Sequence, residues 1–179
     1  SFPTRRSSDL HERAVAATDA GHFAEEIVPV GDVTVDEGIR RGSTLEALGS
    51  LRTPFRDDGV VTAGNASQIS DGSAALLLTT SAKARELGLT PLARVHTVAL
   101  AGVDPVMMLT GPIPATTKVL ERAKMTIEQM DLVEINEAFA PVVLSWEKEH
   151  HPDMSKVNVN GGAIALGHPL GASGTRLMT

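Results

Sequence analysis

The chain has 179 residues, of which 42% are hydrophobic and 21% charged, a globular composition that excludes a disordered or fibrous protein. It carries 16 basic and 22 acidic residues, hence a formal charge of −6, and only four Phe and one Trp as aromatic residues. These numbers argue against a nucleic-acid-binding surface, which needs clustered basic and stacking side chains. No apolar run reaches the roughly 18 residues of a membrane span. With no secretory signal in view, we expect a cytoplasmic protein.

The chain contains no cysteine. A disulfide framework, a cysteine-ligated zinc site and a thiol nucleophile within these 179 residues are therefore excluded.

The first ten residues differ in character from the rest of the chain. Residues 1–10 (SFPTRRSSDL) are polar, show no periodicity and resemble translated adapter sequence, so we expect a non-native leader; the alternative is a disordered terminus. Helical spacing begins at Leu10 and ends near Gly21. Residues 25–30 predict an edge strand, because Pro29 cannot donate a ladder hydrogen bond. A capping box over residues 43–46 predicts a helix that extends to residue 51.

The remainder alternates between apolar runs and helical patterns. This alternation indicates an α/β domain. Strands are expected at 73–79 (buried on both faces), 92–100, 132–135 and 157–159, and helices at 81–87, 115–123 and 137–149, with a second capping box at 126–129. Residues 171–179 look like the opening of a helix, so we expect the sequence to be truncated there.

The glycine-rich segment 158–174 is the strongest candidate for chemistry. His168 stands between Gly167 and Pro169, so we expect a loop to present it as a base or a hydrogen-bond donor. The alternative is a structural histidine in a turn. Neither GxGxxG nor GxxxxGK occurs, so a phosphate-binding loop is not indicated.

Two further segments are ambiguous from their residues alone. Asn136 follows a predicted strand and could be a helix N-cap, or its amide could hold a water or an oxyanion in a cleft at the strand ends. Residues 62–67 could be an ordinary turn. The pair His150-His151 at a predicted helix end has no third ligand at useful spacing, so no metal site is expected.

Taken together, three strings resemble one family. AGNAS at 63–67, NEAFA at 136–140 and NGGAIALGHPLGASG at 160–174 are similar to the thiolases, the acetyl-CoA C-acyltransferases, and the likeness runs from about His11 to Thr179. The resemblance implies an α/β fold of five layers, α-β-α-β-α, present only in part. It assigns 11–70 to the end of a loop domain, 71–89 to the last strand and helix of the N-terminal half, and 90–179 to a truncated C-terminal domain.

The resemblance also implies a chemistry. A thiolase transfers an acyl group between CoA thioesters, by thiolysis of a 3-ketoacyl-CoA or by condensation to acetoacetyl-CoA, through a cysteine acyl-enzyme and a second, acid–base cysteine. Both cysteines would lie outside this chain, so we expect the fragment alone to be inactive. His168 matches the histidine that activates the nucleophile and helps form an oxyanion hole, and Asn136 matches the asparagine that fixes the water of that hole.

The same resemblance implies further residues and partners. The substrates would be acyl-CoA and CoA, with no other cofactor, no metal, no nucleic acid and no membrane partner, and the full-length protein would be a homodimer or homotetramer. Gln68 and the segment 140–150 look like a bacterial subgroup, some of whose members act in β-oxidation of fatty acyl or sterol side chains. Residues matched to the CoA and pantetheine site are Arg40, Leu51, Phe55, Ala63, Ser67, Met108, Ala138 and Phe139.

Two alternatives stay open. The chain could belong to a non-catalytic CoA-binding module that has lost its cysteines, or to a ketosynthase-like condensing enzyme, which the NEAFA string disfavours. The full reading frame would separate the first from an enzyme, because only an enzyme needs a cysteine in each missing part.

Overall fold

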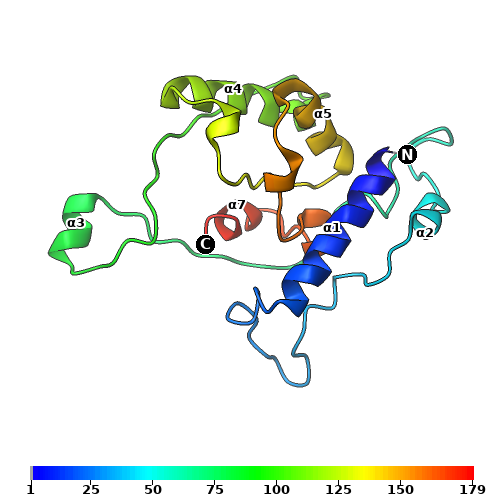
Figure 1. Cartoon of the computed structure of the whole chain (residues 1–179), viewed down its shortest axis with the longest axis horizontal. Helices are drawn as coiled ribbons and strands as arrows, with labels where there is room; N and C mark the ends of the chain where they lie inside the picture. The colour runs from blue at the N-terminus through cyan, green and yellow to red at the C-terminus, as the bar shows by residue number, and fades with distance from the viewer. Residues whose placement is uncertain (1) are drawn as a thin grey trace.

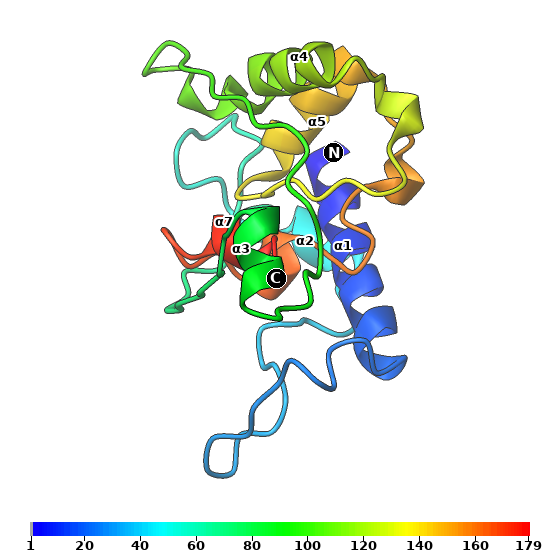
Figure 2. The same ribbon diagram turned by 90° about the vertical axis from the view of Figure 1, so that its left-hand side faces the viewer.

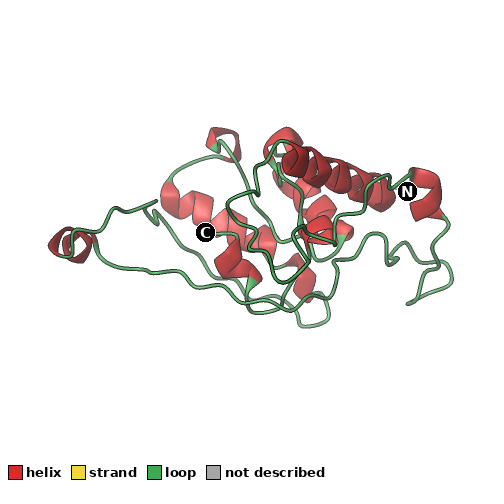
Figure 3. Cartoon of the chain, turned by 90° about the horizontal axis from the view of Figure 1, so that it is seen from below, coloured by secondary structure: helices red, strands yellow, loops and turns green. Residues whose placement is uncertain are grey.

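A computed structural model describes residues 2–179, which form helices joined by long extended segments (Figure 1). Over these residues there are isolated β-bridges but no continuous strand, so the view coloured by secondary structure shows only helices and loops (Figure 3). The α-helices are α1 (Phe2–Asp19), α2 (Leu45–Gly49), α3 (Ser81–Glu86), α4 (Pro112–Ala123), α5 (Ala140–His150), α6 (Ala163–Leu166) and α7 (Ser173–Arg176). Short 3₁₀ helices are η1 (Met108–Thr110), η2 (Ile127–Gln129) and η3 (Met154–Lys156).

Helix α1 begins at Phe2 and not at Leu10, so the expectation that the helical segment starts only at Leu10 was wrong. The first turns bury polar side chains, and a search for apolar periodicity therefore misses them. The hydroxyl of Ser7 donates to the carbonyl oxygen of Pro3, and that of Ser8 to Ser43 O. The suggestion that residues 1–10 are a non-native leader, of which Ser1 lies outside the described residues, stays a prediction.

Helix α5 joins two apolar clusters and so organises the core. Ala140 packs with Leu10 and Ala14 of α1 and with Ile164 and Ala165 of α6. On its other side Val143 and Trp146 pack with Val157, and several half-buried side chains surround them: Ile113, Ile127, Val133, Ile135 and Met154. The glycine-rich segment thus rests directly on α1 and α5, the framework beneath the candidate site.

The expected strands 73–79 and 92–100 are not formed, and the expected burial of 73–79 on both faces was wrong. Both segments are extended, but Leu78 is 67% exposed and Leu92 is 94% exposed. A strand exists only with a hydrogen-bonded neighbour, and no other described segment pairs with these two. The apolar runs are present in the sequence, but the sheet that would bury them is not formed by residues 2–179.

The expected strands 132–135 and 157–159 do meet. Val133 and Val157 form a parallel bridge, with Asn158 N donating to Val133 O at 2.9 Å and Val133 N donating to Lys156 O at 3.0 Å. This pairing places the NEAFA string beside the start of the glycine-rich segment. The expected edge strand 25–30 is not formed: residues 25–26 are turn, 27–29 are irregular, and Val30 forms only an isolated bridge with Val33.

Several helices begin at residues other than those that the sequence predicts. Thr44, not Ser43, caps α2, its hydroxyl accepting from Ala47 N at 3.1 Å. The capping box at 126–129 is confirmed, although the helix it opens is the short 3₁₀ helix η2. Helix α4 starts earlier than expected, at Pro112, because proline favours a first helical turn.

Two parts of the chain extend away from the clustered helices. Helix α3 stands apart at the end of two long connecting segments in Figures 1 and 3. The loop between α1 and α2 reaches far below the helices in Figures 1 and 2. None of the helices formed by residues 2–179 is both long and apolar enough to cross a membrane.

Candidate active site

His168 follows helix α6 in an extended loop, as the sequence predicts. Helix α6 ends at Leu166 and is capped by Gly167, whose φ of +85° favours glycine and where a side chain would collide with the hydroxyl of Ser70. His168 N donates to Gln68 O at 3.2 Å, and Ile69 and His168 form a parallel bridge. The backbone of 68–70 therefore holds the histidine in place.

The side chain of Asn136 lies against His168. Its Nδ2 atom is 3.4 Å from His168 Nε2, although the two residues are 32 positions apart in the sequence. Helix α5 begins only at Ala140, with Phe139 as its N-cap, so the interpretation of Asn136 as a helix N-cap was wrong. The predicted helix start at residue 137 was early for the same reason: residues 136–139 form an extended connection that presents the amide to the histidine.

A third residue, Ser173, completes this contact, although no sequence pattern pointed to it. Ser173 is buried, and its Oγ lies 2.6 Å from His168 Nδ1. The same hydroxyl donates to Pro169 O at 3.3 Å. A serine five residues after His168 is visible in the motif, but only the folded loop shows that it reaches the ring.

The segment 63–67 runs beside the NEAFA string. Ala66 and Phe139 form an antiparallel bridge, Ser67 N donates to Ala138 O at 2.7 Å, and Ala140 N donates to Asn65 O at 3.0 Å. The three motifs, far apart in sequence, are thus neighbours in the fold. Ser67, Ala138 and Phe139, all expected at the pantetheine site, lie together here.

The segment 62–67 is also a turn, as the structural alternative proposed. Asn65 is buried, and its side chain closes the turn: Oδ1 accepts from Thr62 N at 3.0 Å and Nδ2 donates to Val60 O at 2.7 Å. The turn positions Ser67 against Ala138, so the structural interpretation and the proposed site are compatible.

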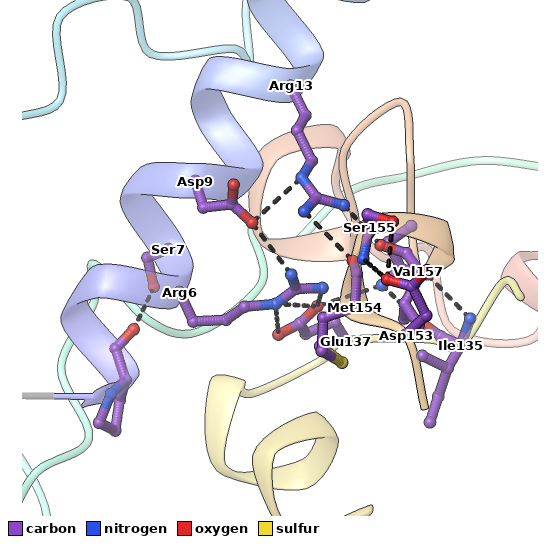
Figure 4. A network of polar contacts seen from close by, with 12 residues as sticks. Arg6, Ser7, Asp9, Arg13, Ile135, Glu137, Asp153, Met154, Ser155 and Val157 are labelled. Atoms are coloured by element: carbon purple, nitrogen blue, oxygen red, sulfur yellow. Dashed lines mark hydrogen bonds and ion pairs between the residues drawn. The ribbon is translucent and has the colours of Figure 1, made fainter. Parts of the chain in front are cut away.

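Glu137, next to Asn136, is a buried carboxylate that no sequence pattern singled out (Figure 4). The guanidinium of Arg6 donates to both carboxylate oxygens, with Nη2 to Oε2 at 2.9 Å and Nε to Oε1 at 3.0 Å. Asn158 Nδ2 donates to Glu137 Oε2 at 3.1 Å and to Ile135 O at 2.9 Å. Burial raises the pKa of Glu137, and the bonds and charge of Arg6 and the bond from Asn158 oppose that rise. This network fixes the backbone immediately before and after Asn136.

The other residues expected at the CoA site lie on loops and on the surface, and among residues 2–179 no hydrogen bond joins them to His168 or Asn136. Arg40 is exposed on the loop between α1 and α2, and its backbone N donates to His11 Nδ1 at 3.3 Å. Phe55 lines an open surface hollow together with Val60 and Val61. Leu51 approaches the backbone of buried Gly64, Met108 is exposed in η1, and Ala63 is exposed.

No cluster of three metal-ligating side chains occurs among residues 2–179. His150 Nε2 lies 3.0 Å from Ile113 O, and His151 ends α5 in a left-handed conformation with φ +49°. The side chains that meet at His168 are the amide of Asn136 and the buried hydroxyl of Ser173.

Comparison with known families agrees with this geometry. The N-terminal domain of thiolase matches residues 8–82, and the C-terminal domain of thiolase matches residues 89–179. The chain belongs to the thiolase family. Both matches together include all three motifs that meet at His168.

Curated thiolase relatives are about 50% identical to the chain. A steroid 3-ketoacyl-CoA thiolase of Mycobacterium tuberculosis is 52% identical over 98% of this chain and 44% of its own length. An acetyl-CoA acetyltransferase of Allochromatium vinosum is 52% identical over 93% of this chain and 45% of its own length. The chain therefore spans about half the length of the curated relatives it matches.

Solved thiolase structures share the arrangement of this part of the fold. The acetyl-CoA acetyltransferase of Bacillus anthracis superposes with a TM-score of 0.90 at 43% identity, covering 99% of this chain and 47% of the other. Human mitochondrial 3-ketoacyl-CoA thiolase in complex with CoA gives a TM-score of 0.87 at 40% identity, covering 98% of this chain and 45% of that one. The chain is a partial thiolase fold, as its motifs predict.

Proposed function

We propose that the complete protein is an acyltransferase that moves an acyl group between CoA thioesters through a cysteine acyl-enzyme, in the direction of thiolysis or of condensation. The observation that carries the proposal is the contact between Asn136 Nδ2 and His168 Nε2, made by two separate thiolase motifs. Because this chain has no cysteine, the nucleophile and the acid–base thiol belong to other parts of the complete protein.

The roles of the chain's residues follow from their chemistry. His168 Nε2 takes the proton of the nucleophilic thiol, since the thiolate and not the thiol attacks a thioester. The resulting imidazolium donates a hydrogen bond to the oxyanion that develops on the acyl oxygen. Asn136 holds a water that supplies a second donor. Such preorganised donors each contribute about 10²–10³-fold to turnover.

The substrate would approach along the segments that lie beside His168. Ser67, Ala138 and Phe139, which the backbone pairing of 66–67 with 138–139 brings together, would line the path of the pantetheine arm. Arg40, Leu51 and Phe55 would contact the nucleotide end, where a guanidinium pairs with phosphate and an aromatic ring stacks on adenine. Met108 and Ala63 complete the set proposed for CoA.

Finer assignments belong to the same proposal. A role in β-oxidation fits the relatives named 3-ketoacyl-CoA thiolase, whereas those named acetyl-CoA acetyltransferase fit a condensing role equally well. We also place the protein in the cytoplasm and expect a homodimer or homotetramer, with CoA thioesters as substrates and no further cofactor.

The test is thiolysis of acetoacetyl-CoA by the complete protein and by His168→Ala. Loss of the base and of one oxyanion donor should lower turnover by about three orders of magnitude or more. His151→Asn, which removes an exposed histidine at the end of α5, is the matched control and should retain activity. Circular dichroism checks that each variant folds.

Two other outcomes would contradict the proposal. Near-normal turnover by a folded His168→Ala protein would return His168 to the role of a structural turn residue. Binding of CoA without turnover by the unmodified protein would instead favour the non-catalytic CoA-binding module.

A further inference from the structure

We infer that Gln68 is a positioning residue that ties the loop carrying Arg40 to the loop carrying His168. The part of this inference that concerns CoA rests on the proposed function. The tie itself rests on hydrogen bonds within the chain.

The side-chain amide of Gln68 bridges two distant segments. Its Nε2 donates to Gly38 O at 2.6 Å and to Ala165 O at 3.3 Å, contacts that span 30 and 97 sequence positions. Ala165 is fully buried in helix α6, two residues before the loop of His168 begins. Gly38 lies two residues before Arg40 on the loop between α1 and α2. One amide group, with its two N–H donors, thus connects the proposed nucleotide end of the site to its catalytic end.

The backbone of Gln68 makes a separate contact with the catalytic loop. Gln68 O accepts from His168 N at 3.2 Å, and this bond does not depend on the side chain. A substitution at Gln68 therefore leaves the attachment of His168 in place. It removes only the side-chain bonds to Gly38 O and Ala165 O. Experiment can therefore separate the role of the side chain from that of the backbone contact with His168.

The Arg40 loop needs such a link because most of it extends away from the helices (Figures 1 and 2). Near Gly38, Ile39 packs on the apolar cluster of α1, α5 and α6, and Arg40 N donates to His11 Nδ1. The Arg40 contact attaches the loop to α1, and the packing of Ile39 attaches it to α1, α5 and α6. The Gln68 amide adds a hydrogen-bonded link from this loop to the segments beside His168.

Two substitutions of similar size remove the donors in different ways. Gln68→Met keeps the length of the side chain without any N–H group, and Gln68→Glu places carboxylate oxygens against the two carbonyl oxygens. Losing the hydrogen bonds should raise KM for CoA about three- to tenfold in Gln68→Met. Repulsion of the carboxylate should raise it about tenfold or more in Gln68→Glu. The kcat should stay within about twofold in Gln68→Met, because the His168 backbone contact remains.

The experiment combines steady-state kinetics with hydrogen exchange on the complete protein. In Gln68→Met, amides of residues 36–43 should exchange faster, while those of 165–173 keep their protection. Gln129→Met is the matched control, since it removes a side-chain bond to the backbone at Thr126, far from the site.

If hydrogen exchange at residues 36–43 is unchanged in Gln68→Met, the proposed link between the two loops is wrong, whatever the activity of the enzyme. If these amides exchange faster but the KM for CoA is unchanged, the link exists but does not affect CoA binding, which contradicts that part of the inference. A large fall in kcat in Gln68→Met would show that the side chain positions His168 itself and would also contradict the inference. If the unmodified protein does not turn over any acyl-CoA, the proposed function fails, and the exchange result still decides the tie.

Discussion

The Nδ1 atom of His168 lies 2.6 Å from the hydroxyl oxygen of buried Ser173. That hydroxyl also donates to Pro169 O at 3.3 Å, so it can accept from the ring, an arrangement that fits the tautomer with its proton on Nδ1. In that tautomer Nε2 is an acceptor, and it faces the amide nitrogen of Asn136 at 3.4 Å. Under the proposed function, this tautomer is the one in which Nε2 can take a proton from the thiol of the complete protein.

Removing this hydroxyl should weaken catalysis without weakening binding. In Ser173→Ala the ring loses its partner at Nδ1 and is free to rotate or to carry its proton on Nε2. We expect kcat to fall about two- to tenfold, with KM for CoA unchanged. Steady-state kinetics of the complete protein measure both parameters. Ser155→Ala, at an exposed serine, is the control, and a kcat equal to that of the unmodified protein would contradict the assigned proton position.

Asn136 should act together with His168 and not independently of it. Asn136→Ala should lower turnover about 10- to 100-fold, less than His168→Ala, because the amide acts through a water. The double variant should be little worse than His168→Ala alone, since groups that act as a unit are strongly non-additive. Thiolysis rates of the three variants test this. Losses that simply multiply would show that the two side chains work separately.

Glu137 should make stability depend on pH. Its pKa in the folded protein is raised by burial above the ordinary value of 4.5, so the folded state keeps a proton that the unfolded state releases. The stabilisation from this group is complete below about pH 4.5 and is lost as pH rises through the folded pKa. Urea unfolding of the complete protein at several pH values should therefore show a smaller decline with pH in Glu137→Gln than in the unmodified protein. Glu149→Gln, at an exposed glutamate, should leave the decline unchanged.

The 179-residue chain by itself should fold poorly. Its runs 73–79 and 92–100 are extended without ladder partners, and large apolar side chains such as Leu78 and Leu100 are exposed there. We expect association and no cooperative thermal transition by calorimetry and light scattering. Leu78→Asp with Leu100→Asp should reduce association without restoring a transition. A cooperative transition in a monomer of the unmodified chain would refute this expectation.

The motifs in the sequence identified most of the candidate site. The segments 63–67, 136–140 and 160–174 together resemble one family, and in the fold hydrogen bonds join the first to the second, while the side chain of Asn136 in the second lies against His168 in the third. The placement of His168 in a loop followed from its neighbours Gly167 and Pro169, which is local backbone chemistry. The sequence could not show that Asn136 is outside helix α5, because an asparagine before a helical pattern is also a good N-cap.

The sequence by itself determined the family, the motifs and the local conformations that short-range sterics impose, such as the turn at Gly167 and the capping box at 126–129. Tertiary structure alone decided which polar groups are buried and paired. Ser173, Gln68 and Glu137 are ordinary polar residues in the sequence, and each becomes informative only when a distant or folded-back segment supplies its partner. The same reason explains the missing strands: an apolar run encodes a preference for burial, but a strand requires a neighbouring backbone, and residues 2–179 do not provide one for 73–79 or 92–100.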